Sequence, residues 1–307
     1  MLALPLALAL LTEWQWRADV GAEINAAPHG VLDLAFREGP WTLSLLTDTL
    51  DARYRAERPD GRVELGGRVE APAALLLISP WTHGAPDETR ARTAGYGGLD
   101  ASWVQYFGHG FYVGLAASLR VYVIADAKDP AVPHLGPTPM FSPELDLGWY
   151  TRDAELKISF AADLGNQQVA PRISAYGRLR PNWIFGPTAE LWAAVASGED
   201  DLTRTRLGGL NPYVVPLAGA GWAEFWAENY AALRAGPSLS LDTFDLSAVA
   251  DLVTFDGSRA LGLGLISRWH PGRFFVESSL GWSPTLERPK DKLAWSLWLR
   301  VGLDWSE

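Results

Sequence analysis

The sequence contains no cysteine and no surplus of basic residues. Without cysteine there is no disulfide framework, no thiolate metal site and no cysteine nucleophile. The 36 acidic residues outnumber the 26 Lys and Arg and give a net charge of −10. Because binding to phosphate backbones requires a basic surface, nucleic acid is not expected as a partner.

The first eleven residues are apolar throughout apart from Pro5. They are too few to cross a bilayer as a helix. They suit the apolar core of a secretory signal, and Ala7-Leu8-Ala9 offers small residues for cleavage, although no basic segment precedes them. We therefore predict a signal-peptide remnant over residues 1–12 and a single domain over residues 13–307. The alternative is a short buried N-terminal strand.

Strongly alternating segments follow this start. In residues 14–26 every second side chain is apolar, and polar residues or glycine stand between them. Similar alternation recurs in residues 111–125, 154–164, 169–180 and 293–305. A β-strand sends successive side chains to opposite faces, so each segment has one apolar and one polar face. The segments are longer than the usual five or six residues of globular strands, and a tilted strand needs about 9–11 residues to cross a bilayer.

Tryptophan is unusually abundant, with 15 residues against 9 Tyr and 11 Phe. Its ring favours the boundary between membrane and water. Many aromatic residues stand near the ends of the alternating segments, which is typical of aromatic girdles. They include Trp14, Trp16, Phe111, Trp149, Trp183, Trp269, Phe274, Trp282 and Trp305.

The links between segments alternate between short and long. Short links are rich in Pro, Gly, Asn and Asp, as in Arg58-Pro59-Asp60-Gly61. Longer links lie near residues 80–93, 126–138 and 197–221, separated by even numbers of strands, so all three fall on one side. We predict an all-β, antiparallel transmembrane β-barrel of about 14 strands, within a range of 12 to 16. Residues 31–58 allow two or three strands, because the face changes there through a bulge or a turn.

The chain after residue 12 resembles the outer-membrane β-barrel proteins of Gram-negative bacteria. The resemblance implies a location in the outer membrane, contact with membrane lipid, and recognition by barrel-assembly machinery during biogenesis. In that class the last strand usually ends in an aromatic residue, whereas here Trp305 is followed by Ser306 and Glu307.

A glycine-rich link, residues 206–219, resembles the outer loop of surface-antigen barrels related to outer-membrane assembly factors. It lacks their Val-Arg-Gly-aromatic signature, since the chain contains no Arg-Gly dipeptide. If this link folds inward, it constricts or plugs the lumen. The simpler interpretation is an ordinary loop whose Gly and Pro make turns.

Charges of both signs follow the polar faces of the strands and must face away from lipid. The predicted lumen-lining charges are Arg17, Asp19, Glu23, Arg120, Glu155, Lys157, Arg172, Arg178, Arg180, Glu224, Glu228, Arg234, Arg268, Glu277 and Arg300. They fit equally well a channel that selects solutes by charge or an ion-pair network that fills a closed barrel. Arg172, Arg178 and Arg180, opposite Glu155 and Lys157, favour a salt-bridge ladder.

The sequence offers few candidate catalytic residues. His29, His109 and His270 fall in predicted short turns on the periplasmic side, whereas His83 and His134 fall in longer loops. The best acid–base or metal candidate is His83 with Asp87 and Glu88, for which a solvated loop is the favoured interpretation. Gly95-Tyr96-Gly97-Gly98 leads into a strand and does not form a phosphate-binding loop. We expect no catalytic residue, no cofactor, no metal site and no enzymatic activity.

Two functions follow from these patterns. The charged inner face favours a pore or channel for small polar solutes. The alternative is a closed structural or assembly-related barrel that binds partners through its outer loops.

Overall fold

The computed structural model of the chain describes residues 15–25, 29–47, 49–70, 76–78, 81–82, 85–86, 92–127, 138–165, 169–199, 204–210, 215–220, 224–286 and 294–305. The predicted signal remnant over residues 1–12 lies outside the described residues and stays a prediction. Trp14, His83, Asp87, Glu88, His134, Ser306 and Glu307 also lie outside them.

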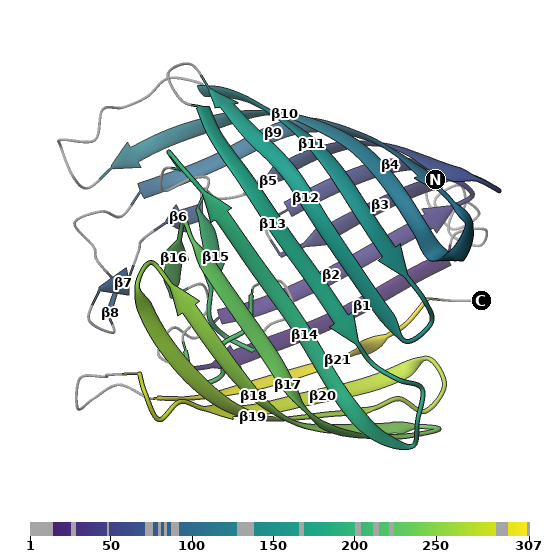
Figure 1. Cartoon of the computed structure of the whole chain (residues 1–307), viewed down its shortest axis with the longest axis vertical. Coiled ribbons are helices and arrows are strands. Elements are labelled where there is room, and N and C mark those ends of the chain that lie inside the picture. The colour runs from purple at the N-terminus through teal and green to yellow at the C-terminus, as the bar shows by residue number, and fades with distance from the viewer. Residues whose placement is uncertain are drawn as a thin grey trace, which may run out of the picture.

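One antiparallel sheet closes on itself to form a barrel (Figure 1). The ring is completed where β1 (Gln15–Ile24) pairs with β21 (Trp295–Leu303). The other wall strands are β2 (His29–Glu38), β3 (Trp41–Leu46), β4 (Thr49–Arg58), β5 (Gly61–Glu70), β9 (Arg92–Tyr106), β10 (Phe111–Ala127), β11 (Thr138–Tyr150), β12 (Ala154–Gly165), β13 (Val169–Leu179), β14 (Phe185–Ala196), β17 (Tyr230–Leu241), β18 (Phe244–Phe255), β19 (Ser258–Trp269) and β20 (Phe274–Trp282). The predicted all-β antiparallel barrel is confirmed.

Within the described residues the barrel wall has 16 strands, so the predicted number of about 14 is too low, and 16 is the upper limit of the predicted range. The short β6 (Leu76–Ile78) adds none, because it follows β5 and pairs with the same neighbour, β9. Residues 31–58 hold parts of three strands, of which β3 has only six residues. Thr47, with a φ of 52°, turns the chain from β3 into β4, so the change of face is a turn. A strand this short shows too little alternation to be recognised in the sequence.

The long links share one end of the barrel with a few short turns, whereas every link at the other end is short (Figure 1). Links between wall strands at 71–91, 128–137 and 197–229 share one end, whereas β1 begins and β21 ends at the other. The predicted asymmetry is therefore confirmed, and in outer-membrane barrels the long loops face outward. The only helical element in the described residues is a 3-10 turn over Gly108–Gly110, and no helix there is long and apolar enough to cross a membrane.

The apolar face of the sheet points outward and the ionic face points inward. In β21, Leu299 is 50% exposed on the outer surface, whereas its neighbour Trp298 is fully buried inside. The side chain of Arg300 is only 14% exposed and also points inward. This orientation follows from strand alternation together with the cost of placing a charge in lipid.

Aromatic side chains border the outer surface at both ends. Near the short turns, the exposed aromatic residues include Trp41, Phe107, Phe111, Trp183, Phe185, Trp269 and Phe274. Near the long links they include Phe141, Trp282 and Trp295. Leu, Val and Ile side chains fill the band between these two borders, as expected for a surface in contact with lipid.

The junction of the first and last strands is stabilised from inside the barrel. Asp19 accepts two hydrogen bonds from Arg300, at 2.6 and 2.7 Å, across the β1–β21 pair. The ring of Trp298 covers Gly21, where an added Cβ would lie 2.6 Å from the ring. The indole of Trp298 also donates to Glu277 at 2.9 Å. The terminal strands are thus joined by side chains as well as by the ladder.

Candidate functional site

The link between β14 and β17 folds into the lumen. Its described residues 204–210, 215–220 and 224–229 are called the inward segment below. It carries a small hairpin of β15 (Thr205–Leu207) and β16 (Phe225–Ala227). Leu207 and Leu217 are fully buried and pack with Val253 and Ala260 of the barrel wall. The sequence left open whether this link folds inward, and the structure places it inside.

Three wall side chains accept hydrogen bonds from the backbone of the inward segment. Glu23 of β1 accepts from the amide of Leu210 at 2.9 Å, and Asp251 of β18 accepts from the amide of Ala218 at 2.8 Å. Ser296 of β21 accepts from the amide of Gly219 at 3.1 Å. Because unpaired backbone amides are costly to bury, these side chains fix the segment against the wall.

Small residues in the wall make room for this segment. An added Cβ on Gly281 would lie 2.8 Å from the Cβ of Ala218, and one on Gly262 would lie 2.7 Å from the Ala218 carbonyl oxygen. Gly219 has a φ of +81°, and its added Cβ would lie 2.4 Å from the amide nitrogen of Ser283. We call the strands that make most of these contacts, β17–β21 and β1, the packed wall; Val31 of β2 and Trp192 of β14 also pack against the segment.

The inward side chains of β4, β5 and β9–β13 form a second surface, called the ionic wall below. Its acidic and basic groups pair within a strand, between neighbouring strands and with the link after β14. The ion pairs include Arg53–Asp51 (2.6 Å), Arg53–Glu64 (2.6 Å), Arg68–Asp51 (3.0 Å), Lys157–Asp146 (3.5 Å), Lys157–Glu144 (3.6 Å), Arg178–Glu155 (3.3 Å) and Arg172–Glu199 (3.4 Å). The side chains of Arg178 and Lys157 remain 46% and 34% exposed, so water reaches them inside the barrel.

The predicted salt-bridge ladder exists, but with different partners from those expected. Only Arg178 pairs with Glu155, because Lys157 turns towards β11 and Arg172 turns towards the link after β14. Arg180, just after β13, pairs with Asp245 at 3.4 Å.

The remaining predicted lumen charges lie in other groups. On β1 and β2, Arg17 pairs with Asp33 at 2.6 Å. On the packed wall, Arg234 binds Asp251 with two hydrogen bonds of 2.7 and 2.8 Å, and Arg268 pairs with Asp304 at 3.0 Å. Glu224 and Glu228 flank β16 and belong to the inward segment instead of a wall strand.

The predicted lumen-lining charges left out several aspartates that form ion pairs with the basic residues. Asp33, Asp51, Asp146 and Asp163 are all inward and each contacts a basic residue. A usable signal was present, because several of these residues lie an even number of positions from a charged residue on the same strand. Asp51 and Arg53, for example, share one face of β4.

The histidines do not assemble a reactive site in the described residues. His29 begins β2 at the end with the long links, so its predicted place in a periplasmic turn is wrong. There it lies 3.8 Å from Glu23. His109 and His270 do lie in short turns at the other end. No group of three or more His, Asp or Glu in the described part of the chain is arranged to hold a metal ion.

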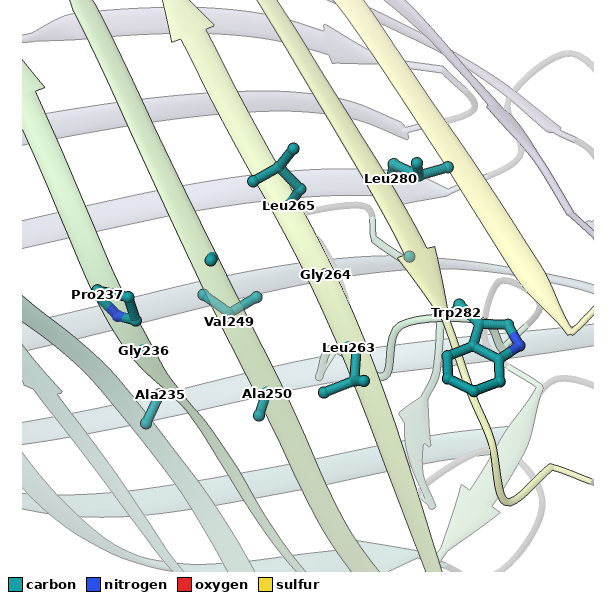
Figure 2. Close-up of a pocket in the computed structure, with 12 residues that line it drawn as sticks. Ala235, Gly236, Pro237, Val249, Ala250, Leu263, Gly264, Leu265, Leu280 and Trp282 are labelled. Atoms are coloured by element: carbon teal, nitrogen blue, oxygen red, sulfur yellow. The ribbon is translucent and has the colours of Figure 1, made fainter.

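A hollow of about 510 Å³ opens on the lipid-facing surface over β17–β20 (Figure 2). Ala235 and Ala250 form its shallow floor, and Leu263, Leu280 and Trp282 form one side. Its lining is almost wholly apolar, and it lies within the band that contacts acyl chains. It is therefore a feature of the lipid interface and not part of a route for polar solutes.

Solved structures similar to this chain include outer-membrane barrels. CdiB from Acinetobacter baumannii matches 95% of this chain and 60% of its own, with a TM-score of 0.64 and 13% identity. BamA from Haemophilus ducreyi lacking POTRA domains 1-3 matches 95% of this chain and 70% of its own, with a TM-score of 0.66 and 9% identity. A porin matches 94% of this chain and 98% of its own, with a TM-score of 0.50 and 9% identity.

These likenesses show the fold, and this chain spans about 60% of the length of CdiB. No family model and no curated protein sequence matches the chain. The predicted resemblance to outer-membrane β-barrels is confirmed, and the apolar outer band agrees with the predicted location in the outer membrane.

Proposed function

We propose that this chain is a pore for small polar solutes, narrowed on one side by the inward segment. The observation that supports this most is the partial exposure of the ionic wall inside a closed barrel. Charged side chains that retain exposure in such a place need water around them, because an ion without solvent or a partner is very costly. A water-filled lumen lined by both charge signs suits small polar solutes.

The described residues of the inward segment make their hydrogen bonds to wall side chains mainly on the packed wall. Its backbone is bound by Glu23, Asp251 and Ser296, all of them on the packed wall. The hydrogen bonds and buried contacts of its described residues are thus concentrated on one side of the lumen. A passage along the ionic wall follows from this one-sided arrangement.

Single-channel recording in a planar bilayer tests the proposal. We expect discrete conductance steps from the folded protein. A variant whose residues 204–227 are replaced by a short Gly-Ser linker should give larger steps, because it widens the lumen. Silence from both proteins, with folding checked by heat-modifiable gel migration, would rule out a pore.

A second candidate is a closed barrel whose inward segment or outer loops bind a partner. The buried docking of Ala218 and Gly219 favours it, because a firmly held segment blocks part of the lumen. Conductance in the linker variant alone, with silence from the native chain, would support this candidate over the open pore. The absence of enzymatic activity remains part of the proposal under both candidates.

A further inference from the structure

A small hollow of about 130 Å³ opens into the lumen on the ionic wall. Four neighbouring strands, β4, β5, β9 and β10, contribute its lining. The residues around it are Arg53, Arg68, Tyr96, Gly98, Leu99, Asp100, Ser118 and Arg120. Three of these eight residues are arginines, and the only carboxylate among them is Asp100.

At the hollow a glycine lies between two arginines in one cross-strand row. Gly98 on β9 pairs with Arg68 on β5 and with Arg120 on β10. An added Cβ on Gly98 would lie 2.8 Å from the carbonyl oxygen of Leu119 and 3.2 Å from Cγ of Arg120. Only glycine fits at this position, because β10 and the stem of Arg120 pack closely against it at the edge of the hollow.

The arginines around the hollow differ in their carboxylate partners. Arg53 contacts Asp51, Glu64 and Asp100, and Arg68 contacts Asp51. Arg120 forms none of the ion pairs between described residues. Its side chain is hydrogen-bonded to Tyr122, and its guanidinium lies over the ring of Tyr96, 5.8 Å from the ring centre. Asp100 is held by Arg53 at 3.3 Å, which offsets its negative charge at the edge of the hollow.

We propose that this hollow binds a small oxyanion, either inorganic phosphate or the phosphoryl group of a passing solute. The fork of an arginine matches the geometry of phosphate oxygens, and Arg120 is the expected primary donor, because Arg53 and Arg68 already bind carboxylates at the edge of the hollow. The hydroxyl of Ser118 supplies a further donor. The recognising groups are side chains on a strand wall, unlike the backbone loop of a nucleotide site.

The site deepens the proposed pore function, because it places an anion-binding step on the water-filled side of the lumen. It requires only that the ionic wall be reached by solvent. Binding by the folded protein is therefore measurable whether or not the barrel conducts.

Equilibrium dialysis of labelled inorganic phosphate against the folded protein in detergent tests the site. Arg120→Gln should weaken binding at least about tenfold, since removing a charge-assisted donor costs about 1.5–3 kcal/mol. The matched control is Arg178→Gln, an inward arginine on β13 that lies outside the hollow and should leave binding unchanged. No binding by the native chain, or equal binding by Arg120→Gln, would overturn the proposal.

Two further arms separate the possible outcomes. If Arg120→Gln does not fold, Arg120→Lys keeps the charge but loses the fork and should still weaken binding; unchanged binding would count against the site. Glucose 6-phosphate should compete with phosphate and glucose should not, and competition by glucose would contradict oxyanion recognition. Phosphate binding without conductance would refute the pore alone, whereas conductance without phosphate binding would refute the site alone.

Discussion

The packed wall and the ionic wall belong to one sheet, yet they use their inward positions in opposite ways. On the packed wall the inward positions facing the segment carry small residues such as Gly262, Gly281 and Ser296. On the ionic wall the inward positions carry long charged side chains such as Arg53 and Lys157. Where protein fills the lumen, small inward side chains leave room for it. Where water fills the lumen, long charged side chains remain solvated.

The polar groups of the two walls also have different partners. Asp251 on the packed wall is 1% exposed and accepts hydrogen bonds from both Arg234 and the amide of Ala218. Glu155 on the ionic wall has one ion-pair partner, Arg178, and both side chains remain partly exposed. A buried group with several partners should matter far more for stability than an exposed pair.

The largest expected effect comes from the buried acid of the packed wall. Asp251→Ala leaves Arg234 buried without its carboxylate, which should reduce the free energy of unfolding by about 3–5 kcal/mol. The matched change on the ionic wall, Glu155→Ala, should cost about 1 kcal/mol or less. Urea unfolding of both variants in lipid vesicles gives the two values. Equal losses would mean that the two walls do not differ in this way.

A smaller effect is expected at a crowded glycine of the inward segment. Gly219 and Gly257 have similar φ values, +81° and +84°, but an added Cβ has no neighbour within 4 Å at Gly257. Gly257→Ala therefore costs only the backbone strain, about 1–2 kcal/mol. Gly219→Ala should cost about 1–3 kcal/mol more, because it also overpacks the contact with Ser283.

The readouts are urea unfolding and the hydrogen exchange of residues 215–220. Faster exchange only in Gly219→Ala would localise the strain to the inward segment. The same exchange in both variants would show that the segment is not tightly packed against the wall.

The smallest expected effect is a pH dependence of stability near Glu199, where the link between β14 and β17 begins. Burial raises the pKa of Glu199 to about 7, an increase that nearby Asp163 and Glu228 promote and Arg172 opposes. Because the folded-state pKa lies above the unfolded value, this group stabilises the fold most at low pH. The contribution is lost as pH rises through about 7.

Hydrogen exchange of the amides around Glu199 between pH 6 and 8, corrected for intrinsic rates, measures this effect. We expect weaker protection at the higher pH in the native chain, and no such change in Glu199→Gln. An identical pH profile in the two proteins would show that Glu199 does not titrate in this range.

The sequence predicted the wall better than the contents of the barrel. The alternation in residues 293–305 correctly placed Leu299 outside and Arg300 inside, because side-chain direction in a strand depends only on parity. The sequence left open whether residues 31–58 form two or three strands, since the six residues of β3 carry little periodic signal. The sequence could not predict the hollow beside Gly98, because the hollow depends on which residues face one another across β5, β9 and β10.

By itself, the sequence determined that strands with one apolar and one ionic face alternate with short and long links. That is enough for a closed barrel in lipid, because water on one side and acyl chains on the other leave one orientation of the sheet. Only the tertiary structure decided which charges pair, which wall the inward segment covers and which arginines line the hollow beside Gly98. Those outcomes depend on the register between strands distant in sequence, such as Asp19 with Arg300, and a local pattern carries no information about it.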